Sequence, residues 1–337
     1  MNREKYSRQS LFQPIGAEGQ EKLLRSRVAI LGCGALGTAQ ANALVRAGVG
    51  RIRIVDRDFV EESNLQRQML FDEADAAASL PKAVAAERKL RMINSDVQVE
   101  GVVADAESHN IENLVEGFQV ILDGTDNFAT RYLINDVAIK HGIPWIYAAA
   151  VASYAATLTI IPGRTPCLAC VFPRPPEGMQ DTCETVGVIG PAVAWAASIQ
   201  VTETFKILLG RLDDLHGSLL ACDLWKNHFQ QIKPAIRSDC RVCGGREFAH
   251  LESRATSSTT LCGRDAVQIS MGESRHLDLA ALRARLERFG TVRGNEYLLR
   301  CLLGGYDLTI FPDGRAIIKG TDDPVVARSL YAKYIGA

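Results

Sequence analysis

Three glycines near the start of the 337-residue chain have the spacing of a phosphate-binding turn. Gly32, Gly34 and Gly37 form a G-x-G-x-x-G pattern, with the apolar run 28–31 before it and the helix-forming run 38–46 after it. In such a turn the first glycine allows a tight bend, the second lets a phosphate approach the backbone, and the third lets the helix pack on the strand. The helix start adds unpaired N–H groups and the positive end of its dipole. The pattern therefore predicts a bound nucleotide.

Polar residues follow the next predicted strand, 51–55. Asp56 comes directly after that strand, where an acidic side chain can accept hydrogen bonds from a ribose. The run 58–70 then leaves the edge of the sheet at which ligands of parallel sheets bind. A solvated helix cap is the alternative for this run. Its side chains that could reach the nucleotide include Asn64, Arg67 and Gln68.

A lysine and a pair of acids extend this predicted site. Lys82 begins a helix predicted over 82–93, where a cation opposes the helix dipole, so its position favours a phosphate partner. Asp123 and Asp126 follow a short apolar strand, 120–122, and precede a helix. Carboxylates in this position suit a Mg²⁺ ion that is also bound by substrate phosphates. Two further polar residues come next in the chain, Asn127 and Arg131.

Four of the nine cysteines form two C-x-x-C pairs. Four thiolates are the tetrahedral set of a structural Zn²⁺ ion, which contributes on the order of 10 kcal/mol to local folding. A redox pair is the alternative, but that chemistry expects a single pair near a β-α-β unit. We therefore predict a zinc site without a catalytic role. Its ligands are Cys167, Cys170, Cys240 and Cys243.

A fifth cysteine, Cys183, lies in a segment rich in proline and glycine, 172–186, which predicts a mobile loop. An exposed cysteine in a loop can act as a nucleophile, whereas a buried one is inert packing. Both readings stay open for Cys183.

The alternation of strands and helices predicts an α/β fold with a doubly wound, mostly parallel sheet of the Rossmann type. The uncharged run 142–163 contains a proline and breaks into two strands, so we expect no membrane span there. Residues 187–209 form a nearly apolar helix that suits a core or a twin subunit. The predicted domains are 1–252, a linker at 253–260, and a small α+β domain at 261–337.

The charge and composition disfavour some classes of partner and indicate the cellular compartment. A formal net charge of −1 gives no electrostatic reason to bind nucleic acid or an anionic membrane. The first ten residues are polar and do not look like a signal peptide. The odd number of scattered cysteines argues against a disulfide framework. We therefore expect a cytoplasmic protein.

These motifs together resemble the ThiF/MoeB/HesA family of adenylyltransferases, the bacterial relatives of ubiquitin-activating enzymes. The resemblance spans roughly residues 6–246 and rests on YSRQ, GCGALG, Asp56, SNLQRQ, the PK dipeptide, DGTDN with Arg131, both C-x-x-C pairs and the TC segment at Cys183. It implies that ATP activates the C-terminal glycine of a ubiquitin-like sulfur carrier with a Gly-Gly end. A ThiS-type carrier is favoured over a MoaD type, because the start of the tail, CGRDAVQI, is similar to ThiF-type proteins.

The resemblance also implies roles for individual residues. Arg67, Lys82 and a Mg²⁺ ion on Asp126 would neutralise the triphosphate, and Asn64 would orient the α-phosphate. Asp56 would hold the ribose.

Other implied roles involve partners. Arg8 would reach the ATP of a neighbouring subunit, which implies a homodimer, and Cys183 would form a transient link to the carrier during sulfur transfer. The tail is too short for an appended rhodanese domain, so a separate sulfur donor such as a cysteine desulfurase is expected. The segment Ala152–Ser153–Tyr154 departs from the family, because many relatives carry an arginine and a glutamate there.

Two other functions are compatible with parts of the sequence. The glycine turn and Asp56 alone would suit an NAD-dependent oxidoreductase, but that function does not explain Arg67, Lys82 and Asp126 together. A tRNA-base dehydratase of the same fold is disfavoured by the near-neutral charge and by the paired cysteines.

Overall fold

The computed structural model describes residues 3–174, 185–253, 258–261, 265–270 and 277–336. The chain forms two compact units, one of residues 1–76 and 81–253 and the other of residues 77–80 and 254–337. None of the helices in these described ranges is long and apolar enough to cross a membrane.

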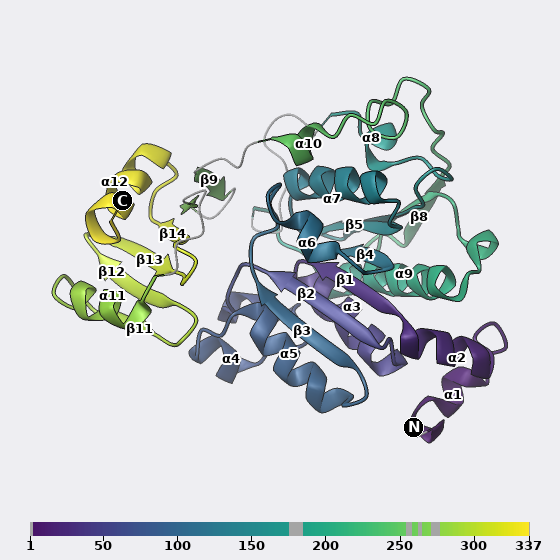
Figure 1. Ribbon diagram of the computed structural model, residues 1–337, viewed down its shortest axis with the longest axis horizontal. Helices are drawn as coiled ribbons and strands as arrows, with labels where there is room; N and C mark the ends of the chain where they lie inside the picture. The colour runs from purple at the N-terminus through teal and green to yellow at the C-terminus, as the bar shows by residue number, and fades with distance from the viewer. Residues whose placement is uncertain (1–2, 175–184, 254–257, 262–264, 271–276, 337) are drawn as a thin grey trace. The chain divides into compact units, whose positions relative to one another are not determined.

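The first unit is built on an eight-stranded sheet with the order β3-β2-β1-β4-β5-β6-β7-β8 (Figure 1). The first five strands in this order are parallel, and the last three continue the sheet in antiparallel pairs. The strands are β1 (Arg27–Leu31), β2 (Arg51–Asp56), β3 (Gln98–Val103), β4 (Val120–Asp123), β5 (Trp145–Val151), β6 (Tyr154–Ile160), β7 (Leu219–Asp223) and β8 (His228–Ile232). The predicted doubly wound, mostly parallel sheet is confirmed.

Helices cover both faces of this sheet (Figure 1). The helices α3 (Ala35–Ala47), α5 (Lys82–Ile93) and α9 (Gly190–Leu209) pack on one face, and α7 (Phe128–His141), with α6 (Ile111–Val115) beside it, packs on the other. The remaining helical elements are η1 (Arg3–Tyr6), α1 (Ser7–Ser10), α2 (Gly16–Arg25), η2 (Glu62–Asn64), α4 (Glu73–Ala77), α8 (Leu168–Val171), η3 (Leu212–Asp214) and α10 (Ala249–Glu252).

Local sequence explains where the long helices begin and end. The Asn127 side chain caps α7 by accepting a hydrogen bond from the Thr130 N–H, and α7 ends at Gly142, which has the left-handed conformation that glycine favours. Helix α9 ends in the same way at Gly210. It begins three residues later than predicted, at Gly190 rather than at residue 187, with a proline in its first turn.

The second unit is an antiparallel sheet with the order β11-β12-β13-β14-β10-β9. Two helices pack on one of its faces, where Leu286, Tyr331 and Ile318 lie in a shared apolar core. The elements are β9 (Ser258–Leu261), β10 (Ala266–Ile269), α11 (Leu279–Leu286), β11 (Val292–Gly294), β12 (Leu299–Leu303), β13 (Tyr306–Ile310), β14 (Ala316–Lys319) and α12 (Pro324–Tyr334). The linker predicted at 253–260 is wrong in its last three residues. Residues 258–260 belong to β9, which pairs with β10.

Candidate functional site

The glycine-rich turn lies between the end of β1 and the start of α3. Gly32 has a φ of 95°, a conformation that glycine adopts without strain. A Cβ atom at Gly32 would lie 2.4 Å from the carbonyl oxygen of Gly124, and one at Gly37 would lie 1.9 Å from the carbonyl oxygen of Gly32. At Gly34 the nearest heavy atom to that position is Nε2 of Gln68, 4.0 Å away. Two glycines therefore pack the turn tightly, and the third leaves room against its backbone.

Asp56 lies at the end of β2, next to this turn. Its carboxylate accepts hydrogen bonds from the backbone N–H of Cys33 at 2.5 Å and of Asp58 at 2.7 Å. Burial raises the pKa of Asp56, and the nearby Lys82 ammonium partly opposes this shift. Each carboxylate oxygen has a second lone pair, so Asp56 can stabilise the turn and also accept from a ribose hydroxyl.

The segment 64–68 contains a buried amide oxygen that has no hydrogen-bond partner among the described residues. Asn64 and Gln68 are buried, at 8% and 3% exposure, while Arg67 is half-buried and donates to the Ser63 carbonyl oxygen. The Oε1 atom of Gln68 is buried without a hydrogen-bond partner among the described residues. Since a buried amide oxygen without a partner costs about 1–3 kcal/mol, Gln68 Oε1 suits a ligand group that donates a hydrogen bond, such as a hydroxyl.

Lys82 begins α5 and contacts the same turn. Its backbone carbonyl oxygen lies 3.8 Å from Sγ of Cys33, and its Nζ lies 3.3 Å from Oδ2 of Asp58. The Lys82 side chain is only 6% exposed. The Lys82 ammonium is also near enough to Asp56 to oppose the rise that burial causes in the pKa of that carboxyl, so a positive charge lies close to the glycine turn.

The two acids after β4 have different environments. The carboxylate of Asp123 is fully buried and accepts from Arg131 Nε at 3.0 Å and from Thr125 N and Oγ1 at 2.9 and 2.7 Å. Asp126 is exposed, and its carboxylate accepts from Asn127 Nδ2 at 3.4 Å. Only Asp126 of this pair is placed to meet a solvated metal ion.

The sequence analysis missed one charged residue beside Asp56, Arg57, and its ion-pair partner Asp105. Arg57 follows Asp56 directly, and its guanidinium lies 2.9 Å from the Asp105 carboxylate and 3.9 Å from that of Asp58. Burial alone would lower the pKa of Arg57, but these two carboxylates outweigh it and raise the pKa. The charged residues 56–58 were the feature of the sequence that could have indicated Arg57. Its contact with Asp105 could not be predicted, because it depends on the pairing of β2 with β3.

Arg8 lies at the opposite end of α3 from the glycine turn. It is exposed in α1, and the neighbouring Gln9 side chain donates to the Ala47 carbonyl oxygen at the end of α3. Tyr6 anchors the same arm, because its hydroxyl accepts from Asn94 Nδ2 at 2.8 Å. At 1.5 Å per residue, α3 separates Arg8 from its own glycine turn by about 20 Å. Cys183, the other predicted residue outside this cluster, lies outside the described residues.

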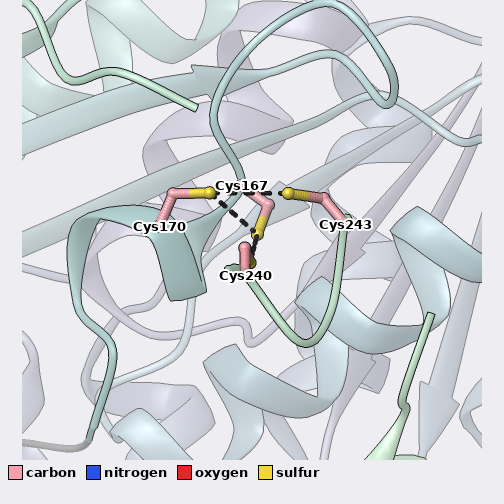
Figure 2. Close-up of side chains that lie close together, drawn as sticks. All are labelled: Cys167, Cys170, Cys240 and Cys243. Atoms are coloured by element: carbon pink, nitrogen blue, oxygen red, sulfur yellow. Dashed lines mark hydrogen bonds between the residues drawn. The ribbon is translucent and has the colours of Figure 1, made fainter. Parts of the chain in front are cut away.

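The two C-x-x-C pairs converge in space (Figure 2). Their four sulfur atoms all lie within 4.8 Å of one another, with separations of 3.9 Å for Cys167–Cys170, 3.6 Å for Cys167–Cys240 and 3.4 Å for Cys170–Cys243. A tetrahedral zinc site with Zn–S bonds of about 2.3 Å requires sulfur atoms about 3.8 Å apart. The side chains therefore fit a four-thiolate metal ion.

Helix α7 supports both segments that carry these cysteines. The Asn135 side chain accepts from the backbone N–H of Leu168 at 2.9 Å, and the Asp136 carboxylate accepts from that of His250 at 2.9 Å. Burial raises the pKa of Asp136. The cysteine cluster thus packs on the helix whose first turn follows Asp126.

Comparison with known proteins identifies the family. Residues 6–242 match the model of the ThiF family. The chain is 47% identical over 336 residues to the sulfur carrier protein ThiS adenylyltransferase of Bacillus subtilis, covering 98% of this chain and 99% of that protein. It is 40% identical over 242 residues to the SAMP-activating enzyme E1 of Haloferax volcanii, covering 72% and 88% of the two chains. The chain belongs to the ThiF family.

The crystal structure of Escherichia coli MccB with ATP has the same fold as the ThiF-family unit. Its TM-score is 0.63 at 24% sequence identity, over 72% of this chain and 75% of that one. A likeness at this identity speaks for the fold alone.

A cavity of about 250 Å³ opens on the antiparallel part of the ThiF-family sheet. It lies on one face of β5–β8, where Ala149, Ala156 and Ala221 are aligned across neighbouring strands. Tyr154 also lines it and is 51% exposed. The small side chains leave space on this face for an apolar group of a partner.

Proposed function

We propose that this protein transfers the adenylyl group of ATP to the C-terminal glycine of a ubiquitin-like sulfur carrier that ends in Gly-Gly, with a ThiS-type carrier as first choice and a MoaD type as second. The relative named for ThiS aligns over nearly the whole chain, the C-terminal unit included. The observation that carries the proposal is the open space at Gly34, bordered by the Gln68 side-chain amide, with the Lys82 charge near enough to Asp56 to oppose the rise that burial causes in its pKa.

The reaction that suits this site joins a carboxylate oxygen of the carrier to the α-phosphorus of ATP. The bond from that phosphorus to the bridging oxygen breaks, and pyrophosphate leaves with the electron pair. The attacking anion and the triphosphate repel each other by about 4 kcal/mol per close charge pair at an effective dielectric constant near 20. Positioning and charge neutralisation are therefore the main tasks of the protein.

The residues around the turn divide these tasks. The N–H groups at the start of α3 would meet the phosphates, and Asp56 would accept from the ribose. Lys82 and Arg67 would offset the negative charge, and Asn64 with Gln68 would orient the α-phosphate and the carboxylate.

The turn after β4 would complete the site. Asp126, with Asn127 beside it, would hold a Mg²⁺ ion, which neutralises charge on the departing pyrophosphate. Arg131 was predicted among the nucleotide-binding residues. Its guanidinium donates a hydrogen bond to the Thr125 carbonyl oxygen in this turn.

The position of Arg8 supports a homodimer. Its own glycine turn lies about 20 Å away, so an Arg8 that acts on a γ-phosphate must serve the ATP of a twin subunit. The cysteine cluster would hold Zn²⁺ as a structural ion. Sulfur would come from a separate donor such as a cysteine desulfurase, with Cys183 as the residue that links transiently to the carrier.

Mass spectrometry of candidate carriers tests the reaction. After incubation with the protein and Mg-ATP, a ThiS-type carrier is expected to gain the mass of one adenylyl group, and a MoaD-type carrier to gain less or none. Asp126→Ala serves as the inactive control, with an unchanged thermal melting curve because Asp126 is exposed. Absence of the adduct on every Gly-Gly carrier tested, together with NADH turnover on small substrates, would replace this function by an oxidoreductase.

The cavity on β5–β8 is the surface we assign to the carrier, because β5 leads from it to the Asp123–Arg131 pair at the nucleotide site. Ala156→Leu would fill part of it and is expected to raise the KM for the carrier about tenfold, with the KM for ATP unchanged. Gln98→Leu, exposed at the opposite edge of the same sheet, is the matched control. Initial rates of adenylation at varied carrier concentration measure the effect, and equal KM values in both variants would contradict it.

A further inference from the structure

The guanidinium of Arg131 donates hydrogen bonds to three residues that lie in different segments of the chain. Its Nε donates to the Asp123 carboxylate at 3.0 Å, and its Nη2 donates to the carbonyl oxygens of Thr125 at 2.8 Å and Ala148 at 2.9 Å. These acceptors belong to the end of β4, to the turn that follows it and to β5. Arg131 therefore ties the turn to two neighbouring strands.

Aromatic rings enclose the same group. The guanidinium carbon lies 5.3 Å from the ring centre of Phe128 and 5.3 Å from that of Tyr147, and the side chain is only 6% exposed. Burial alone would lower the pKa of Arg131, but its acidic neighbours, Asp123 foremost, together raise the pKa. A guanidinium held in this way is a fixed part of the scaffold.

The turn that Arg131 holds has little freedom on either side. The Asp123 carboxylate binds Thr125 N and Oγ1, and Gly124 is so close to Gly32 that a Cβ atom on it would lie 2.4 Å from the Gly32 carbonyl oxygen. On the other side, the Asn127 side chain is the cap of α7. Asp126 is the one residue between these two fixed points, and its carboxylate is exposed.

We propose that Arg131 is a positioning residue, which aims the Asp126 carboxylate at the metal ion of the nucleotide complex by holding the Thr125 carbonyl and the Asp123 carboxylate. The inference rests on the proposed function for the identity of that complex. In this role Arg131 does not bind a phosphate itself. It affects nucleotide binding only by orienting Asp126, the proposed ligand of the metal ion.

Arg131→Lys is the informative variant. It keeps the positive charge, so the buried Asp123 is not left unpaired, which would cost about 3–5 kcal/mol. It loses the planar fork that binds three acceptors at once. Arg53→Lys is the matched control, because Arg53 also bonds a carboxylate and two backbone carbonyls and lies 4.8 Å from the ring centre of Phe118, away from the glycine turn.

Three measurements separate the roles: ATP affinity without divalent ions, Mn²⁺ affinity in the presence of ATP by electron paramagnetic resonance, and the melting temperature. For Arg131→Lys we expect ATP affinity without metal to stay near the wild-type value and Mn²⁺ affinity to fall by about 10- to 100-fold, as for other groups that orient a metal ligand. Arg53→Lys should leave both affinities unchanged.

Two results would overturn the inference. An equal loss of ATP affinity with and without metal would make Arg131 a phosphate ligand, and a lower melting temperature with unchanged Mn²⁺ affinity would make it purely structural. None of the three measurements needs a carrier protein. Failure of every carrier to be adenylated would therefore remove the proposed function without deciding the role of Arg131.

Discussion

Lys82→Met is expected to lower adenylation by about 100- to 1,000-fold, because removing one charge-stabilising group from such a site typically costs about 2.7–4 kcal/mol of transition-state stabilisation. Lys82 is buried, and its backbone carbonyl contacts Cys33 in the glycine turn, so no solvent cation can take its place readily. Carrier-dependent exchange of pyrophosphate into ATP measures the loss. The protein should still fold, since Asp58 keeps Arg57 as a neighbour at 3.9 Å.

Lys89→Met provides the matched control on the same helix. Lys89 also forms ion pairs with two carboxylates, of Asp72 at 2.5 Å and of Asp75 at 2.6 Å, and these pairs have no contact with the glycine turn. Its loss should lower stability, because Asp75 is buried, but leave exchange near the wild-type rate. Equal exchange rates in the two variants would show that Lys82 only stabilises the fold.

Cys240→Ser is expected to abolish metal binding by the cysteine cluster and to lower the free energy of unfolding by several kcal/mol. Structural four-ligand zinc sites contribute about 10 kcal/mol or more to the folding of small domains, and here part of that support is shared with the bonds from α7 to both segments. Metal content by mass spectrometry and thermal melting measure the two effects. A strong chelator should shift the wild-type melting curve in the same direction.

Cys222→Ser is the control for this variant. Cys222 is also buried, but it lies in β7 outside the cluster, so its replacement should leave the metal content unchanged. The zinc assignment fails if the wild-type protein melts at the same temperature before and after chelation and contains no metal as purified.

The elements of the first unit were largely predictable, because local patterns define them. The strands predicted at 28–31, 51–55 and 120–122 correspond to β1, β2 and β4, and the helices predicted at 38–46 and 82–93 correspond to α3 and α5. Some predicted boundaries differ from the observed ones by a few residues, as at the start of α9. The spacing of apolar residues does not show which residue begins the helix. The strand β9 was missed, because a run of serines and threonines has the composition of a linker and becomes a strand only when β10 lies beside it.

The residues of the site were predictable as types, but their roles were not. Asp123 and Asp126 read alike in the string DGTDN, and only the structure separates them: one completes a buried strand and pairs with Arg131, and the other lies in the exposed turn. Arg57 carried no motif, because its partner Asp105 is distant in the chain.

Residue types and short spacings are enough to predict the chemistry that the chain can offer: a glycine turn for phosphates, cations and carboxylates near it, and four thiolates in two pairs. Residue type and short spacing act locally. The tertiary structure alone decided which groups meet, because parallel strands bring together loops that are far apart in the chain. It placed Gly124 against Gly32, gathered four sulfur atoms within 4.8 Å and moved Arg8 to the far end of α3. Burial and pairing then set which charges are structural and which remain available to a ligand.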